Sequence, residues 1–190
     1  MPARLSRWLT RVSTGRVTLA LVIILVAFTI LVLPGQSAAA RSTGGGAGSP
    51  DTSLWYSAGD LYRMAEAYGP AGRQAYVQAR FTFDILWPLV YVSGLSTALS
   101  WLLARAAAAG SRWRLVNLAP ALAGLLDLGE NVATSLVMLR YPALTPGVDS
   151  LAAVFTLSKW AVLGFSFLAL FAALANTVRR AATRGPGRSA

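Results

Sequence analysis

The chain of 190 residues contains no cysteine and no histidine, and lysine occurs only once, as Lys159. Without cysteine there is no disulfide, no thiolate metal ligand and no cysteine nucleophile. Without histidine, imidazole-ligated metals, Ser-His-Asp triads and imidazole proton relays are excluded too. Any chemistry must therefore depend on carboxylates, arginines, hydroxyls, amides and one amine.

Charge is also scarce. Only 13% of the residues are charged while 55% are hydrophobic, and the mean hydropathy is +0.55. A soluble domain carries about 25% charged residues, so this composition indicates an integral membrane protein. The net charge of +10 does not predict a nucleic-acid partner, because the arginines lie between apolar runs rather than along one face.

Four segments are long and apolar enough to cross a bilayer, which takes about 20 residues in a helix. We therefore predict an all-α polytopic membrane protein, a four-helix bundle with a short amphipathic helix in its first outer loop. The predicted transmembrane helices are 17–34, one within 70–105, 115–139 and 151–175. The predicted connecting segments are an N-terminal tail 1–16, an outer linker 35–56, an outer helix 57–69, an inner loop 106–114, an outer loop 140–150 and a C-terminal tail 176–190.

The distribution of arginine predicts the orientation. Eleven arginines and no acid lie in the two tails and around the 106–114 loop, whereas the other side has five arginines and four acids. By the positive-inside rule, both termini are cytoplasmic, and we expect a bacterial inner (plasma) membrane. The aromatic residues expected at the two interfaces are Trp8 and Trp113 inside, and Trp55, Tyr56 and Tyr141 outside.

The first span also has features of a signal peptide, since an Arg-rich head and an apolar run precede the small residues 37–40. Its apolar run is longer than the ~7–15 residues of a usual signal sequence, which favours an uncleaved anchor. Cleavage would leave three spans.

Two different patterns follow the first span on the outer side. Residues 35–50 have the composition of a flexible tether. Ser57 and Asp60 then form a capping signature, followed by apolar residues at helical spacing from Leu61 to Tyr68. This helix could lie on the membrane surface or cap the bundle, and packing for stability is favoured over a lid that gates a ligand.

Ionisable residues within the spans are the main candidates for function: Asp84, Asp127, Glu130 and Lys159. Placing each of these charged side chains at the centre of a transmembrane helix costs about 2.5–3.5 kcal/mol. Such side chains therefore face the interior of the helix bundle and pair with another polar group. Glu130 and Lys159 lie ~13 Å and ~12 Å from the outer ends of their helices, at 1.5 Å per residue. Helical spacing places Asn131 and Thr134 on the same face as the two acids of the third span.

The second span adds Arg80, one turn before Asp84, and Tyr91, almost two turns after it. Pro88 lacks an N–H group, so we expect a kink and a free carbonyl at Asp84. The three intramembrane carboxylates and Lys159 would together carry −2 if all were ionised. Arg80 must therefore turn inward, a cation must bind, or one carboxyl must keep its proton. Asp127, expected to be deepest and furthest from Lys159, is the candidate for that proton.

The strings FTFDILWPLVY (81–91), DLGEN (127–131) and TLSKW (156–160), with YGPAGRQAY (68–76), resemble an uncharacterised family of small four-span bacterial membrane proteins. Their shared patterns are D-x3-P-x2-Y, D-x2-E-N and S-K-W. The resemblance implies four helices around one polar centre, and it implies no activity.

Three functions are compatible with this cluster. The residues could fix helix packing, or bind a proton, a cation or a lipid-like ligand, or catalyse a reaction on a lipid-like substrate with Asp127 or Glu130 as acid or base. We favour a non-catalytic role, with the lipid bilayer as partner, no cofactor, and oligomerisation left open. D-x2-E-N is too short a pattern to predict a metal site.

Overall fold

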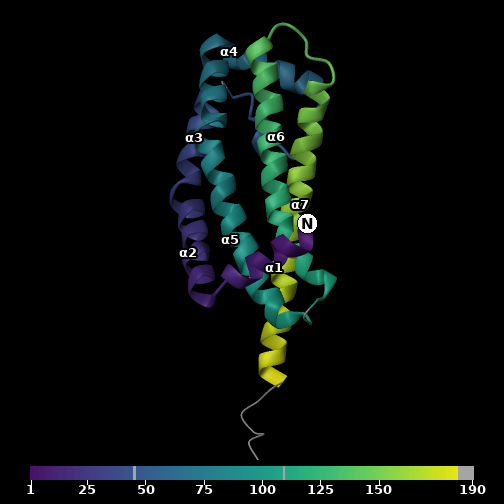
Figure 1. Ribbon diagram of the computed structural model, residues 1–190. Coiled ribbons are helices and arrows are strands. Elements are labelled where there is room, and N and C mark those ends of the chain that lie inside the picture. Colours follow the sequence, from purple (N-terminus) through teal and green to yellow (C-terminus); the bar gives the residue numbers. More distant parts are fainter. Residues whose placement is uncertain (45, 109, 184–190) are drawn as a thin grey trace, which may run out of the picture.

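The computed structural model describes residues 1–44, 46–108 and 110–183 (Figure 1), and all regular structure within them is helical. The α-helices are α1 Pro2–Val12, α2 Gly15–Leu31, α3 Leu33–Thr43, α4 Ala58–Arg80, α5 Phe83–Ala106, α6 Ala119–Arg140 and α7 Val148–Thr183. Two short 3-10 helices are η1 Pro50–Thr52 and η2 Arg112–Leu118. Arg184 and Arg188 of the predicted C-terminal tail lie outside the described residues.

Four stretches of the described chain are long and apolar enough to cross a membrane. They are Gly15–Ser42, Ala58–Ala106, Arg112–Arg140 and Val148–Thr183. Large apolar side chains are exposed along α2, such as Ile23 and Ile30, and along α7, such as Leu168 and Phe171. A soluble monomer rarely exposes so much apolar surface. The prediction of an all-α membrane protein with four membrane-length segments is confirmed.

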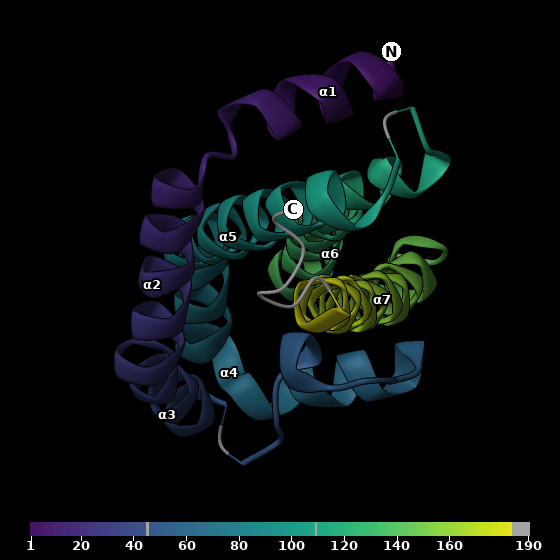
Figure 2. The ribbon, with the colours of Figure 1, turned by 90° about the horizontal axis from the view of Figure 1, so that it is seen from below.

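The helices run roughly parallel to one long axis, with α1 across one end (Figures 1 and 2). α6 and α7 lie side by side, and α2 packs against α5. We call the end formed by α1 and η2 the α1 end. The opposite end, formed by residues 58–69 of α4, η1 and the loop between α6 and α7, is called the α4 end.

The start of α4 follows the capping signature in the sequence. Ser57 and Asp60 form a reciprocal capping box, and Leu61, Ala65 and Tyr68 are buried. These side chains pack in one cluster with residues of α6 and α7, including Val137 and Ala152. The amphipathic helix thus caps the ends of α6 and α7. Gly69 interrupts α4 with φ 62°, a conformation that glycine adopts without steric cost, and Pro70 starts the second part.

Two predicted boundaries differ from the structure. The linker predicted from Gly35 begins as helix α3, which continues to Thr43. Pro34 lies in the first turn of α3, where proline is tolerated, and Ala38–Ala40 favour helix. The single helix predicted over 70–105 is interrupted at 81–82, where the Thr82 hydroxyl donates to the Gln78 carbonyl oxygen at 2.8 Å. This bond competes with the regular helical pattern.

Helices also extend into both predicted tails. α1 has strongly amphipathic spacing, with Leu5, Trp8, Leu9 and Val12 on one side. The sequence predicts only a tail over 1–16, although this apolar spacing is already present in it. α7 has 36 residues, or ~54 Å at 1.5 Å per residue, longer than a ~30 Å hydrocarbon core.

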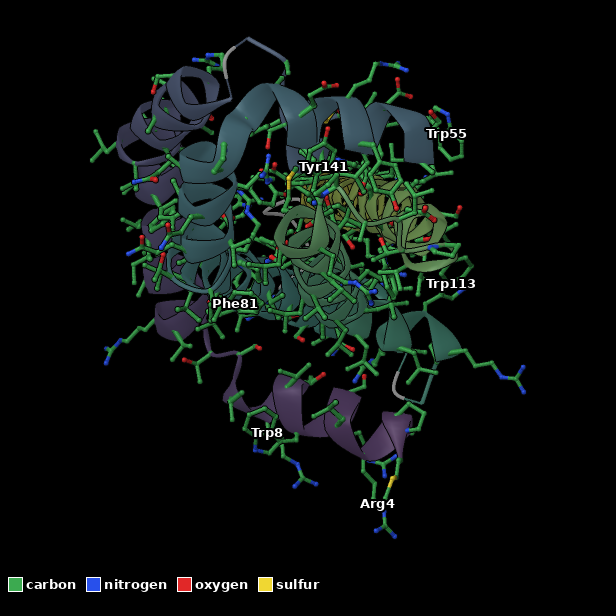
Figure 3. The ribbon with its side chains drawn as sticks, turned by 90° about the horizontal axis from the view of Figure 1, so that it is seen from above. Arg4, Trp8, Trp55, Phe81, Trp113 and Tyr141 are labelled. Carbon is green, nitrogen blue, oxygen red and sulfur yellow. The ribbon has the colours of Figure 1, made fainter. Side chains whose placement is uncertain are left out.

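The aromatic residues predicted at the interfaces are mostly exposed. Trp8, Trp55 and Trp113 lie at the periphery of the molecule (Figure 3). Tyr56 is an exception, because its ring is buried and its hydroxyl lies 3.0 Å from Thr156 Oγ1. The prediction that Tyr56 faces an interface is therefore wrong, since this residue packs in the buried cluster formed by α4, α6 and α7.

Candidate functional site

Lys159, the one lysine, lies between two carboxylates of α6. Its Nζ atom is 3.1 Å from Asp127 Oδ1 and 2.5 Å from Glu130 Oε2. All three side chains are buried. Because Asp127 and Glu130 are three residues apart, they share the face of α6 that packs on α7. The equal depths expected for Glu130 and Lys159 agree with this contact.

Arg80, at the end of α4, forms a second charged group near the first. Its Nε atom is 2.7 Å from Asp84 Oδ2, and its Nη1 atom is 3.0 Å from Asp51 Oδ2. The guanidinium also lies over the Tyr76 ring, 4.5 Å from the centroid, and only 5% of Arg80 is exposed. Arg80 therefore turns inward. This was one of the three predicted ways of balancing the charge of the buried carboxylates.

Asp51 was missed at the sequence level, where it was counted only as an outer-loop charge. It lies in η1, and Ser49 Oγ donates a hydrogen bond to its carboxylate. Burial opposes ionisation of this carboxyl, but the Arg80 guanidinium and the Ser49 hydroxyl outweigh that effect and hold its pKa below the ordinary value. Asp51 is thus a fourth carboxylate, and its only sequence signal is the short Ser49-Pro50-Asp51 turn.

Two hydrogen bonds join α5 to α6 beside the charged groups. Tyr91 OH donates to Asp127 Oδ2 at 3.1 Å, and Asn131 Nδ2 donates to the Asp84 main-chain oxygen at 3.3 Å. The latter oxygen is the one that Pro88 leaves without a helical donor. Thr134, by contrast, donates to the Glu130 carbonyl oxygen of its own helix at 2.8 Å.

The structure thus brings the predicted residues together as two linked groups. Lys159 pairs with the acids of α6, while Asp84 of α5 pairs with Arg80 instead. The expectation that Asp127 is furthest from Lys159 is wrong, because the two are in contact. Glu130 is only 1% exposed, and its Oε1 has no hydrogen-bond partner in the described chain.

A partly open cavity of about 330 Å³ lies against both groups. Its polar wall contains three acids, Asp51, Asp84 and Asp127, together with both cations, Arg80 and Lys159. The aromatic lining residues are Tyr68, Tyr76, Phe83, Trp87, Tyr91 and Trp160. Leu33 of α3 and Leu163 of α7 belong to the apolar wall, together with several alanines. Of the two candidate catalytic residues, Asp127 lines this cavity and Glu130 does not, and a catalytic role for either stays a prediction.

Comparisons with known proteins give no further assignment. No protein-family model, no curated protein and no solved structure matches this chain. The resemblance to a family of four-span membrane proteins therefore stays a prediction. The charges, aromatic rings and cavity of the site are therefore the features that indicate a function.

Proposed function

We propose that this chain is a membrane protein that binds an amphiphile with a cationic head in the cavity beside Asp51, Asp84 and Asp127. The observation that carries the proposal is an excess of acid. Four buried or half-buried carboxylates, those of Asp51, Asp84, Asp127 and Glu130, face only two cations in the described structure. If all were ionised, the site would carry −2.

A net charge of this size is unfavourable in a region of low dielectric constant. A bound cation would bring the site closer to neutrality. Asp127 and Asp84 line the cavity, so a cationic group placed there would reach the unbalanced carboxylates directly. An anionic head group would instead add to the excess of negative charge.

The remaining cavity wall suits a lipid-like molecule with such a head. Aromatic rings, among them Trp87, Tyr91 and Trp160, supply faces that attract cations. Leu33 and Leu163 offer apolar contacts to a chain. The lining residues come from η1 and from every helix from α3 to α7, and α3 and α7 are well separated in Figure 2. The volume is near the lower end of ligand sites, about 300–1,000 Å³, and suits a head group with the start of a chain.

Binding of dodecyltrimethylammonium and dodecyl sulfate to the protein in nonionic micelles, followed by native mass spectrometry, tests the proposal. The ammonium compound should bind and the sulfate should not. Asp127→Asn should weaken ammonium binding about tenfold, the effect of losing about 1.4 kcal/mol. The matched control is Glu66→Gln, which changes an exposed carboxyl outside the cavity. Equal binding of both probes, or equal effects of the two variants, would refute a cation site.

We further propose that the α1 end faces the cytoplasm of a bacterial inner membrane, as the arginine distribution favours. The absence of cysteine makes a direct test simple. Ala108→Cys and Ala143→Cys introduce thiols at exposed positions in loops at opposite ends. In intact spheroplasts, a membrane-impermeant maleimide should label only the Cys at 143. Labelling only at 108 would reverse the orientation.

A further inference from the structure

A second cleft, far from the acidic site, lies at the α1 end between α1 and η2. Its volume is about 430 Å³, and four arginines line it: Arg7 and Arg11 from α1, and Arg112 and Arg114 from η2. Arg7 and Arg11 are one helical turn apart and therefore share a side of α1. The Ser111 hydroxyl adds a hydrogen-bond donor to the same walls, whereas the Thr10 hydroxyl donates to the Ser6 carbonyl oxygen of its own helix at 2.9 Å.

The positive charge of this cleft is not balanced by the protein. None of the chain's seven acidic residues belongs to α1, η2 or the loop between α5 and η2. Across residues 1–44, 46–108 and 110–183, the ion pairs formed by arginine involve only Arg63 and Arg80. Arg7, Arg11 and Arg112 are therefore available to an anion, whereas Arg114 donates to the Ala107 carbonyl oxygen at 2.9 Å.

Buried polar contacts hold the two walls together. Ser6 Oγ donates to the Arg114 carbonyl oxygen at 3.1 Å, and Asn117 Nδ2 donates to the Ser6 carbonyl oxygen at 3.2 Å. Asn117 also donates to Ser100 Oγ of α5 at 2.8 Å. Ser6 and Asn117 are 3% and 0% exposed. The position of α1 beside η2 is thus built into the fold, and with it the spacing of the arginines.

We propose that this cleft binds the phosphate head group of an anionic phospholipid. Guanidinium groups bind phosphate through paired, charge-assisted hydrogen bonds. A lipid is favoured over a free phosphate because the two elements that carry the arginines also expose apolar side chains outside the cleft: Leu5, Trp8 and Val12 of α1 and Trp113 of η2. Figure 3 shows Trp8 at the outside of α1 and Trp113, a residue of η2, at the periphery of the molecule. Tryptophan at this position is typical of the membrane interface, where the phosphates lie.

The test compares two sets of variants with the same loss of charge. Arg7, Arg11 and Arg112 are replaced together by Gln, and Arg114 is kept because it bonds to the main chain. The matched control replaces Arg4, Arg16 and Arg179 by Gln, which are exposed and outside the cleft. Native mass spectrometry of the full chain measures binding of phosphatidylglycerol and of phosphatidylcholine.

The wild type should bind phosphatidylglycerol about tenfold more tightly than phosphatidylcholine, and the cleft triple variant should lose this preference because it lacks three of the basic groups that attract the anionic head. The control triple variant should keep it. Equal losses in both triple variants would overturn the proposal, because they would indicate diffuse attraction.

Full displacement of the lipid by millimolar inorganic phosphate would also overturn it, in favour of a soluble ligand. If the triple variant does not fold, Arg112→Gln alone should still weaken phosphatidylglycerol binding, and an unchanged affinity would count against the site.

Discussion

Asn131 of α6 donates its side-chain amide to the main-chain oxygen of Asp84 of α5, at 3.3 Å. This oxygen lies four residues before Pro88 and so lacks the N–H that a regular helix would provide. A donor from a neighbouring helix therefore satisfies a carbonyl that would otherwise be unpaired in an apolar environment. The same contact fixes α5 against α6 beside both charged groups.

Removing the Asn131 side-chain amide should lower stability more when Pro88 is present than when it is replaced. Asn131→Ala leaves the Asp84 carbonyl unpaired and should lower the free energy of unfolding by about 1–3 kcal/mol. In a Pro88→Ala background, the new N–H can donate to that carbonyl, and the cost should shrink. Denaturant titration in mixed micelles measures both. Asn176→Ala is the control, since Asn176 bonds to Ala106 O and its cost should not depend on residue 88. Equal costs of Asn131→Ala in both backgrounds would contradict this account.

The Lys159 contacts predict a strong coupling with Glu130. Lys159→Met should destabilise the protein by about 3–5 kcal/mol, because Glu130 then has no cationic partner in a buried place. Adding Glu130→Gln should restore a large part of this loss by removing the unpaired charge. Unfolding free energies of the two single variants and the double variant give the coupling energy. A double variant no more stable than Lys159→Met would show that the pair is not coupled.

Gly124 allows α6 to approach α5 closely. A Cβ atom at this position would lie 2.7 Å from Val92 Cγ2, and the branched Val92 side chain has little freedom to move. Gly124→Ala should therefore lower stability by about 1–3 kcal/mol. Gly164→Ala is the matched control, because nothing lies within 4 Å of a Cβ there, and alanine favours helix by about 0.5–1 kcal/mol. Melting temperatures that fall equally for both variants would contradict a packing role.

Asp51 predicts a dependence of stability on pH. Because its pKa in the folded protein lies below the ordinary value of 3.8, the ionised form stabilises the fold at neutral pH. This contribution is lost as pH falls through the lowered pKa. The wild type should therefore melt higher than Asp51→Asn at pH 7, and the difference should shrink on acidification below about pH 4. A difference that stays constant from pH 7 to pH 3 would argue against the Arg80 contact.

The sequence by itself determined the four apolar segments, the cap at Ser57 and the residues that must avoid lipid. Each follows from local physics: the length of a helix across hydrocarbon, the capping of free N–H groups, and the cost of a bare charge. Depth along the helices was enough to predict that Glu130 and Lys159 meet.

The place of Asp51 was decided only by tertiary structure. The contact of Asp84 with Arg80 is compatible with their spacing of four residues, whereas Asp51 joins them from a segment whose composition indicated only a tether. No periodicity in the chain encodes where such a loop returns, because its position depends on how α3, α4 and α7 pack around it. The two cavities are likewise products of that packing, since their walls come from segments far apart in sequence.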